Sequence, residues 1–542
     1  MKRPIPKLYR GFRDIFAEDL MMRREMIEAI RAVYERYGFS PLETPAIEYV
    51  DILGKFLPES ETPEGGIFAF LNENDEWIAL RYDLTAPLSR VVAQYKDLQR
   101  PFRRYQFGPV WRLEKPGVGR YREFYQFDFD TVGTGSLIAD AEACCIGCDA
   151  LEAVGISRGQ YIMKVNSRKV LNGVLEKIGL IEWDARKQII IDKKLPRCQT
   201  TAPDSNASDN TVNCGGLTAD KPVSYFDVLR TIDKLDRVGM VGVRELLTKG
   251  RKDPSGDYMP GLNLDADAVN TIENYLTCRV ESRSQTCDLL AEIVGDSQVG
   301  VEGIAELREI DEFLRALGYD EDRVIFDPTV ARGLAYYTGP VFEATLIQQS
   351  IGRTLLSDNQ STNQTGVSDL PSDYPTGSVF GGGRYDNLVE RFTGQKVPAT
   401  GGSIGVDRLL SALKYLRRGK DRNSIVQVLV TVMDKRRLTE YQLIAQELRT
   451  AGINTEIYLG GGGIGRQLKY ADKCGIPLVV IAGEDEFVRN EVEIKDLQLG
   501  MKLAEEVEER NEWLKDRPAQ FAISRDKLVE SVSETLAGYS LV

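Results

Sequence analysis

Between residues 102 and 132 the chain reads Phe102-Arg-Arg-Tyr-Gln-Phe-Gly-Pro-Val-Trp-Arg112, then Leu113-Glu-Lys-Pro-Gly-Val-Gly119, then Arg120-Tyr-Arg-Glu-Phe-Tyr-Gln-Phe-Asp-Phe-Asp-Thr-Val132. Two strand-like runs flank a loop with proline and glycine, which predicts an antiparallel hairpin. Seven basic residues and one acidic residue, Glu114, lie between Arg100 and Arg122. A cationic hairpin can hold a nucleotide phosphate on its strands and contact a nucleic-acid end with its loop. A solvated charged face is the ordinary alternative.

The segments around this hairpin favour an antiparallel sheet. Residues 18–38 have apolar positions at helical spacing and lead into an extended stretch, 39–45, that ends at a proline. Most neighbouring strands lack the crossover helix that parallel strands need, so the sequence predicts an α+β fold. The expected strands are 76–81, 102–112, 124–132 and 161–165, and the expected helices are 86–95, 138–154 and 168–178.

The chain then changes character. From about residue 180 to 315 it is helical and charge-rich, with a polar interruption at 200–216, which predicts a mainly helical insertion. Strands are expected at 324–326 and 340–347, and the polar stretch 348–377 predicts a long loop between two paired strands.

A final unit begins near Ser424, where strands and helices alternate. This pattern predicts a small α/β domain with a largely parallel sheet. A chain of 542 residues is too long for one core, so several domains are expected. The predicted domains are 1–180, 181–318, 319–420 and 424–542.

Composition excludes several classes of function. The chain contains no histidine, which excludes Ser-His-Asp triads, histidine general bases and histidine metal ligands. Its net charge is -13, so any contact with nucleic acid must be local. No apolar run is long enough to cross a bilayer, and the basic N-terminus lacks the apolar core of a secretory signal. We therefore expect a cytoplasmic protein.

The cysteines do not predict a metal site. Only Cys145 and Cys148 have C-x-x-C spacing, and a zinc site would need two further ligands from cysteines or carboxylates. Residues 138–154 instead fit an amphipathic helix with small thiols on its packed face.

Five blocks of sequence carry a family resemblance. Residues 102–126 resemble motif 2 of the histidyl-tRNA synthetases, and Leu80-Arg-Tyr-Asp-Leu-Thr-Ala-Pro87 looks like the amino-acid and ATP loop of that family. Gly401-Gly-Ser-Ile-Gly-Val-Asp-Arg-Leu-Leu410 looks like class II motif 3. Ala331-Arg-Gly-Leu-Ala-Tyr-Tyr-Thr-Gly-Pro-Val-Phe-Glu343 resembles the histidine-specific motif, and Phe380-Gly-Gly-Gly-Arg-Tyr-Asp386 follows it. The resemblance covers roughly residues 8–180, 322–415 and 425–500.

The resemblance implies a class II catalytic domain in two parts, 1–180 and 319–420, around the insertion, with a C-terminal anticodon-binding domain. It implies adenylation of L-histidine by ATP, with Mg²⁺ accompanying the nucleotide, and transfer to tRNA(His). Adenylation must neutralise charge on the α-phosphate and needs no general base, and the planar fork of arginine suits that task. The catalytic arginines would be Arg112, Arg332 and Arg408.

The remaining roles also follow from the resemblance. Glu114 would meet the adenine edge or a metal, and ATP would contact Arg112 and Arg408 as well. The residues that would bind the α-amino group or form the wall of the pocket are Asp83, Thr85, Gln126 and Asp130. The imidazole would lie against Tyr336 and Tyr337. Contacts with tRNA would come from Lys115, Arg120, Arg466, Lys469 and Lys473. Residues 18–45 resemble motif 1 and imply a homodimer. No zinc and no NAD are expected.

Four positions depart from the family pattern. Asp130 stands where many bacterial relatives carry Glu, and Ala335 where Asp is frequent. Gly117-Val118 stands where relatives place longer polar residues, so the need for an extra 5' guanosine on the tRNA is open.

Parts of the sequence also fit three other kinds of protein. Gly460-Gly-Gly-Gly-Ile-Gly465 satisfies the dinucleotide-binding spacing, with Glu484 about twenty residues on, but its surroundings resemble the anticodon domain of the same synthetases. A synthetase-like regulatory subunit of histidine biosynthesis shares the catalytic fold but in general lacks the anticodon domain. A class II enzyme for glycine, proline or threonine is disfavoured by the paired tyrosines at 336 and 337.

Overall fold

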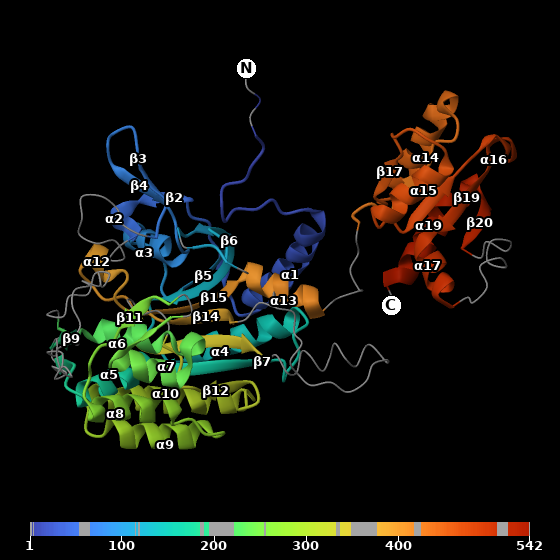
Figure 1. The fold of residues 1–542 in the computed structure, drawn as a ribbon. Helices are drawn as coiled ribbons and strands as arrows, with labels where there is room; N and C mark the ends of the chain where they lie inside the picture. The colour runs from blue at the N-terminus through green and yellow to red at the C-terminus, as the bar shows by residue number, and fades with distance from the viewer. Residues whose placement is uncertain are drawn as a thin grey trace. The chain divides into compact units, whose positions relative to one another are not determined.

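The structure is a computed structural model that describes residues 3, 5–53, 66–113, 115–117, 120–184, 189–193, 222–253, 256–331, 337–347, 377–416, 424–506 and 519–540. The chain divides into two compact units. The first comprises Met1–Arg13 and Arg23–Leu416, and the second comprises Asp14–Met22 and Arg417–Val542 (Figure 1).

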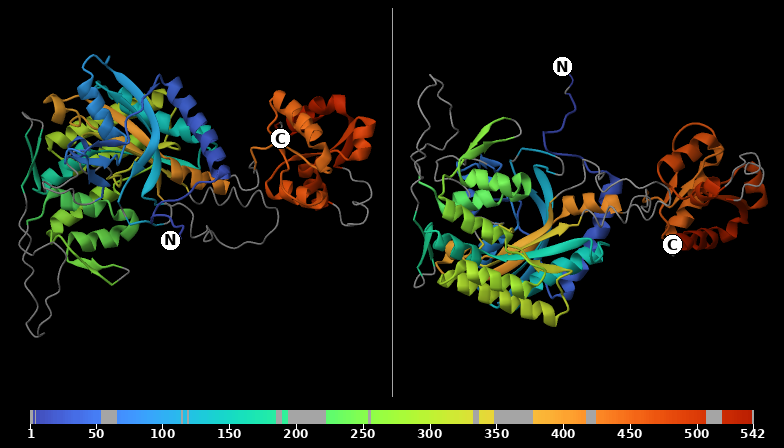
Figure 2. Two further views of the ribbon diagram at one scale, coloured as in Figure 1. Left: turned by 90° about the horizontal axis from the view of Figure 1, so that it is seen from above. Right: turned by 60° about the horizontal axis from the view of Figure 1, so that its bottom comes forward.

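An eight-stranded sheet forms the centre of the first unit. Its outermost pairs, β1 with β5 and β12 with β7, are parallel, and all other neighbours are antiparallel, as the sequence predicted. In Figure 2 the light blue strands β5 and β6 and the orange strands β14 and β15 cross the middle of this unit. The order is β1 (Ser40–Pro41), β5 (Phe102–Trp111), β6 (Glu123–Val132), β15 (Ala399–Gly405), β14 (Ser378–Arg384), β13 (Pro340–Leu346), β7 (Tyr161–Ser167) and β12 (Val324–Phe326).

One face of this sheet is apolar and packed. Strand pairing places Phe342 and Phe380 on the same face of the sheet as Phe129. Tyr34 of α1 (Ala17–Arg36) packs on it, with its ring centroid 4.9 Å from Phe127 and 5.0 Å from Phe129. Helix α4 (Ile138–Ala153) also packs against the sheet and buries Cys144, Cys145 and Cys148, which confirms the packed-thiol interpretation. The opposite face is polar.

Smaller elements surround the sheet. A three-stranded antiparallel sheet in the order β2 (Ile47–Tyr49), β4 (Trp77–Leu80) and β3 (Ala69–Leu71) precedes the helix α3 (Thr85–Gln94), with α2 (Val50–Leu53) after β2. The hairpin of β8 (Ile181–Asp184) and β9 (Ile189–Asp192) follows α5 (Arg168–Lys177). After β14 come α12 (Glu390–Thr393) and, beyond β15, α13 (Val406–Leu416).

The region expected to be a helical insertion is mainly helical in its described part. Ser224, Asp265, Ser282 and Ser297 cap four of its helices through side-chain acceptors, which satisfies amides at the helix starts. It also contains two hairpins that the sequence did not predict. The elements are α6 (Tyr225–Ile232), α7 (Leu235–Leu247), the hairpin β10 (Gly250–Lys252) and β11 (Tyr258–Pro260), α8 (Ala266–Thr277), α9 (Arg283–Val294) and α10 (Gln298–Ala316).

The second unit has a five-stranded mixed sheet. The prediction of a largely parallel sheet is wrong for two strands, because β18 with β19 and β19 with β20 are antiparallel. The six-residue helix α16 (Glu484–Arg489) leads β18 directly back into its neighbour. The order is β17 (Thr455–Ile457), β16 (Val428–Val430), β18 (Leu478–Ile481), β19 (Glu491–Asp496) and β20 (Gln520–Ser524), with helices α14 (Leu438–Thr450), α15 (Ile464–Lys473), α17 (Leu497–Glu506) and α19 (Leu528–Ser540).

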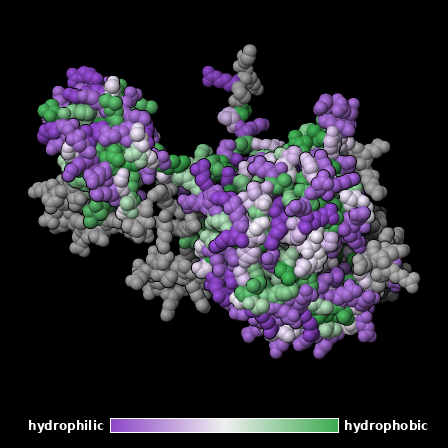
Figure 3. All heavy atoms as spheres, turned by 180° about the vertical axis from the view of Figure 1, so that it is seen from behind, coloured by the Kyte–Doolittle hydropathy of each residue, from purple (hydrophilic) through white to green (hydrophobic). Residues whose placement is uncertain are grey.

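Hydrophilic and hydrophobic side chains are interspersed on the face shown in Figure 3. None of the helices in the described ranges has the length and apolar character to cross a membrane.

Candidate active site

Polar residues gather on the second face of the central sheet because β6 alternates. Its odd positions face the apolar core, and its even positions, Gln126, Asp128 and Asp130, face the other side. Strand pairing aligns these side chains with those of β5 and β15. The three rows are Gly108 with Gln126 and Gly405, Gln106 with Asp128 and Ser403, and Arg104 with Asp130 and Gly401.

Asp130 is already paired within the protein. Arg104 has no solvent exposure, and its Nη2 lies 2.6 Å from Asp130 Oδ2. Tyr385 Oη donates to the other oxygen, Oδ1. Burial raises the pKa of Asp130, while the Arg104 charge and the Tyr385 hydrogen bond oppose that rise. Arg104 Nη2 also donates to Leu84 O at 2.9 Å, so this pair anchors the start of α3.

Asp130 Oδ2 makes no hydrogen bond either, but it has the ion pair with Arg104, whereas Gln126 and Asp128 each keep an acceptor oxygen that has no hydrogen-bond partner among the described residues. Gln126 Nε2 donates to Ser403 Oγ at 2.8 Å. Within the described part of the chain, Gln126 Oε1 and Asp128 Oδ1 are buried and have no hydrogen-bond partner. Burial raises the pKa of Asp128 to about 7, although Arg104 lowers it. Such acceptors are costly to bury unless a ligand satisfies them.

Asp83 and Thr85 lie at the start of α3. Asp83 Oδ1 accepts hydrogen bonds from Thr85 N at 3.2 Å and from Ala86 N at 2.8 Å. Burial raises the pKa of Asp83, and the two amides oppose that rise. The preceding residue, Tyr82, accepts a hydrogen bond from Arg112 Nε at 3.1 Å through its carbonyl. The structure therefore brings Arg112 alongside the loop that carries Asp83.

Arg408 lies in the first turn of α13, which starts directly after β15. Its Nη1 donates to Ser378 O at 3.1 Å, at the start of β14. Its neighbour Asp407 accepts from Tyr125 N at 2.7 Å and from Arg13, and burial raises the pKa of Asp407. These bonds fix α13 against β6, the strand that carries Gln126.

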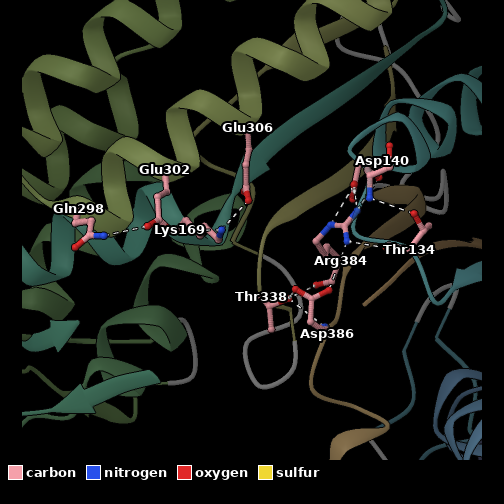
Figure 4. Close-up of polar contacts among 10 residues, drawn as sticks. Thr134, Asp140, Lys169, Gln298, Glu302, Glu306, Thr338, Arg384 and Asp386 are labelled. Atoms are coloured by element: carbon pink, nitrogen blue, oxygen red, sulfur yellow. Dashed lines mark hydrogen bonds and ion pairs between the residues drawn. The ribbon is translucent and has the colours of Figure 1, made fainter. Parts of the chain in front are cut away.

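Tyr337 begins the described part of the segment that leads into β13. Its ring lies against Gly383, where an added Cβ would approach to 3.0 Å. Thr338 Oγ1 donates to Asp386 Oδ2 at 2.9 Å, and Thr338 N donates to Arg384 O at 2.8 Å. Arg384 in turn pairs with Asp140 of α4 and donates to Thr134 O at 3.3 Å, as Figure 4 shows. This network anchors the start of β13.

A second network holds the chain just before residue 332. Asn166 Nδ2 donates to Pro328 O at 3.1 Å and to Val330 O at 2.8 Å. The hydroxyl of Tyr275, which belongs to α8, donates to Asn166 Oδ1 at 3.1 Å and lies 2.8 Å from Nδ2. Arg279 Nη1 donates to Asp327 Oδ2 at 2.9 Å, and Asp327 N donates to Val165 O at 2.8 Å. The chain is thus tied to β7 just before residue 332, and β13 pairs with β7 from Pro340 onward.

Comparison with known proteins decides the family. The chain matches the family model described as histidyl-tRNA synthetase over residues 11–213 and the one described as anticodon binding domain over residues 427–534. It is 48% identical to a protein of Roseobacter denitrificans named histidine--tRNA ligase, covering 100% of this chain and 99% of that protein. A Brucella abortus protein of the same name is 44% identical, covering 98% and 96%.

The chain belongs to the histidyl-tRNA synthetase family.

Solved structures agree with this membership. A crystal structure of histidyl-tRNA synthetase from Nostoc sp. PCC 7120 matches with a TM-score of 0.66 at 26% identity, covering 98% of this chain and 100% of that chain. A Bacillus halodurans structure titled ATP phosphoribosyltransferase regulatory subunit/histidyl-tRNA synthetase matches with a TM-score of 0.59 at 21% identity, covering 87% and 97%, and shows the fold alone.

Several residues expected at a synthetase site are brought together, and others lie outside the described residues. The polar face carries Gln126 and Asp130, and Asp83 lies close enough to interact with Asp130. Arg112 bonds the carbonyl of Tyr82, next to Asp83. The residues outside the described ranges are Glu114, Arg332 and Tyr336.

The residues expected to contact tRNA are exposed. Lys115 and Arg120 lie on the β5–β6 hairpin loop, where Gly117 pairs with Arg120. Arg466, Lys469 and Lys473 are exposed along α15 in the second unit. Buried Gln467 on the same helix bonds both the amide and the carbonyl of Val432, at 2.9 Å and 2.8 Å, and so ties α15 to the chain just after β16.

Sequence reasoning missed Asp128, Arg104 and Asn166. The signal for Asp128 was present, because the run Gln126-Phe-Asp-Phe-Asp130 alternates with period two. Arg104 was counted in a basic cluster, but it is fully buried, whereas Arg103 points to the other face and pairs with Glu142 at 2.7 Å. Asn166 had no local signal.

Proposed function

We propose that this member of the histidyl-tRNA synthetase family activates L-histidine with ATP and transfers it to tRNA(His). The observation that carries the proposal is the polar sheet face, where β6 carries the unpartnered acceptors Gln126 Oε1 and Asp128 Oδ1 between two strands, β5, which leads to Arg112, and β15, which leads to Arg408. Identity of 44–48% to relatives named histidine--tRNA ligase, over nearly their full length, supports this function over the regulatory alternative.

In the proposed reaction the histidine carboxylate attacks the α-phosphate of ATP and pyrophosphate leaves. Arg112 and Arg408 neutralise charge on the phosphates, and Arg332 bridges the carboxylate and the α-phosphate. No proton must be removed from the attacking carboxylate, which fits a chain without histidine. Mg²⁺ comes with ATP as the counter-ion of its phosphates. No group of three or more acidic or cysteine side chains within the described ranges could hold a metal by itself.

The amino-acid pocket uses the remaining predicted residues. Asp83, Thr85, Gln126 and Asp130 bind the α-amino group or form the wall, and the two tyrosines, Tyr336 and Tyr337, lie against the imidazole. The bonds of Asp130 to Arg104 and Tyr385 support a wall role for that carboxylate. Glu114 contacts the adenine.

Transfer needs contacts with tRNA at two places. We assign Lys115 and Arg120 to the acceptor end, and Arg466, Lys469 and Lys473 to the anticodon. The match of residues 427–534 to an anticodon binding domain supports the second assignment. We also propose that the chain has a catalytic domain in two parts, 1–180 and 319–420, an insertion at 181–318 and an anticodon domain at 424–542.

Charging of tRNA(His) with labelled histidine by the full chain tests this proposal. The expected result is ATP-dependent charging that is lost in Arg332→Ala. Removing one preorganised charge-stabilising donor lowers such rates about 100-fold or more. Arg332→Lys should rescue only in part because it keeps the charge but loses the fork. Absence of charging by a folded wild-type chain would contradict the proposal and favour a regulatory role.

We also propose a homodimer in the cytoplasm. Large apolar side chains of the small sheet, Ile47, Tyr49, Phe70 and Leu71, are each between 44% and 49% exposed. Ile47 and Tyr49 also line a cavity together with Leu42, Thr44 and Pro45, which end the segment that resembles motif 1. Sedimentation should give twice the 60.7 kDa chain mass. A fully active monomer would contradict this.

A further inference from the structure

The N-terminal segment of the chain lies against the loop of the β5–β6 hairpin. Arg122 N donates to Gly11 O at 2.9 Å, and Arg112 N donates to Arg122 O at 2.9 Å. The backbone of the segment therefore pairs with the chain that returns from the loop, and that chain pairs with Arg112. Because Arg112 is one of the arginines proposed to neutralise the phosphates of ATP, two hydrogen bonds join the segment to the nucleotide site.

Side chains fill the contact between the segment and the loop. Gly11 has a φ of +88°, and a Cβ added there would approach both Arg122 Cγ and Pro116 Cγ to 2.9 Å. The guanidinium of Arg122 lies 5.3 Å from the ring centroid of Tyr9, and that ring lies 5.5 Å from Phe12. The positive φ and the close approach both favour glycine at position 11.

Arg13 extends this contact to a second arginine of the nucleotide site. Its guanidinium carbon lies 3.7 Å from the ring centroid of Tyr121, in the loop. The same guanidinium forms an ion pair with Asp407. Asp407 precedes Arg408 in α13, and its Oδ2 accepts a hydrogen bond from Tyr125 N at 2.7 Å. One side chain therefore contacts both the hairpin loop and the helix that carries Arg408.

The ion pair of Arg13 neutralises a buried carboxylate. The side chain of Asp407 is 5% exposed, and that of Arg13 is 28% exposed. Burial raises the pKa of Asp407, and the charges of Arg13 and Arg23 oppose that rise. Arg23 of α1 itself lies over the ring of Tyr125, 4.3 Å from its centroid. A guanidinium suits the place of Arg13 because it can stack on a ring and bond a carboxylate at the same time.

We infer that Arg13 is a positioning residue for ATP, which holds the hairpin loop and the start of α13 at a fixed spacing so that Arg112 and Arg408 meet one triphosphate together. This inference rests on the proposed function. Two arginines on separate elements bind one ligand more tightly when their spacing is set in advance, because less order is then imposed on binding. Arg13 acts through Tyr121 and Asp407 and needs no contact with the nucleotide.

Calorimetry of ATP and of histidine, each binding alone to the full chain, tests this role. Arg13→Gln removes the charge and the stacked guanidinium. A cation–π contact and an ion pair at a half-exposed site are each worth about two- to tenfold in an equilibrium constant. Affinity for ATP should therefore fall about 5- to 30-fold, while affinity for histidine changes by less than about twofold. Arg13→Lys should restore ATP affinity in part because it keeps the charge but loses the planar stack.

Arg437→Gln is the matched control. Arg437 also lies over an aromatic ring, 4.9 Å from the centroid of Phe487, and pairs with Glu440 at 2.9 Å, with 30% of its side chain exposed. It belongs to the second unit, so both affinities should be unchanged. Unchanged ATP affinity in Arg13→Gln would overturn the inference. An equal fall in the affinities for ATP and histidine would also overturn it, since Arg13 would then only stabilise the fold.

A double-mutant cycle tests the route through the loop. Tyr121→Leu removes the ring on which Arg13 stacks. In the Tyr121→Leu chain, Arg13→Gln should therefore lower ATP affinity by a smaller factor than in the wild type. Equal factors in the two chains would contradict the inference.

Gly11→Ala disturbs the same contact from the backbone side and decides the matter if Arg13→Gln folds poorly. Its Cβ would collide with Arg122 and Pro116, whereas Gly155, with a φ of +96°, has no neighbour within 4 Å of an added Cβ. Only Gly11→Ala should lower ATP affinity, and equal ATP affinities for Gly11→Ala and Gly155→Ala would overturn the inference. A wild-type chain that binds ATP but forms no histidyl-adenylate would overturn the proposed function, while the ATP affinities of the variants would still decide the role of Arg13.

Discussion

The Tyr275 hydroxyl offers a sharp test of how the histidine-specific block is positioned. Tyr275 is fully buried on α8, and its Oη lies 2.8 Å from Asn166 Nδ2 and 3.1 Å from Asn166 Oδ1. Asn166 in turn holds the carbonyls of Pro328 and Val330, just before Arg332. Tyr275→Phe removes the hydroxyl and keeps the ring, so only this polar contact changes.

The size of the effect follows from the bonds lost. Asn166 Oδ1 keeps the amide of Ser167 at 2.8 Å, and Nδ2 keeps two carbonyls, so the asparagine is only partly freed. Losing a buried hydrogen bond of this kind lowers the free energy of unfolding by about 1 to 2 kcal/mol. If the contact acts mainly when charge develops at the α-phosphate, adenylation slows about 5- to 30-fold. The KM for ATP should change little.

Single-turnover histidyl-adenylate formation is the assay, with Tyr441→Phe as its control. Tyr441 is also fully buried and donates to Ala482 O at 2.8 Å, but it belongs to the second unit. The two variants should lose similar stability, while only Tyr275→Phe slows adenylation. Equal adenylation rates for both variants and the wild type would refute the positioning role of Tyr275.

Three further predictions address the sheet face and the second unit. Gly401→Ala would place a Cβ 2.2 Å from Asp130 Oδ1 and should lower the unfolding free energy by about 1 to 3 kcal/mol, whereas Gly405→Ala on the same strand should cost much less. Denaturant titration of the pair checks this, and equal losses would count against it. Asp128 has a pKa of about 7 in the folded chain, whereas an unfolded aspartate has a pKa of about 4. The free energy of unfolding should therefore fall by a few kcal/mol as pH rises from about 4 to about 7, and Asp128→Asn should flatten that slope. Truncation before Ser424 should abolish charging of tRNA but spare pyrophosphate exchange, and equal loss of both activities would contradict a tRNA-reading role.

Local patterns predicted much of the fold. The hairpin strands expected at 102–112 and 124–132 are β5 and β6, and the helix expected at 138–154 is α4, because alternation and helical spacing are properties of neighbouring residues. Strand β15 was not predicted, since its run Ala399-Thr-Gly-Gly-Ser-Ile-Gly405 has little strand propensity of its own. It is a strand because β6 and β14 pair with it on both sides.

Long-range partners limited what the sequence could say of the site. Asp130 was expected to meet the substrate, but its partners Arg104 and Tyr385 come from β5 and from the end of β14, 26 and 255 residues away. The anchoring of the histidine-specific block by Asn166 and Tyr275 likewise joins residues 109 positions apart. Family resemblance located the motifs, whereas the bonds that hold them depend on strand register.

ATP–pyrophosphate exchange across a panel of the twenty amino acids tests the central claim most directly. The wild-type chain should exchange pyrophosphate with histidine alone, at a rate that depends on Arg112 and Arg408. Exchange with glycine, proline or threonine instead, or no exchange by a folded chain with any amino acid, would contradict the assignment of this sheet face to histidine activation.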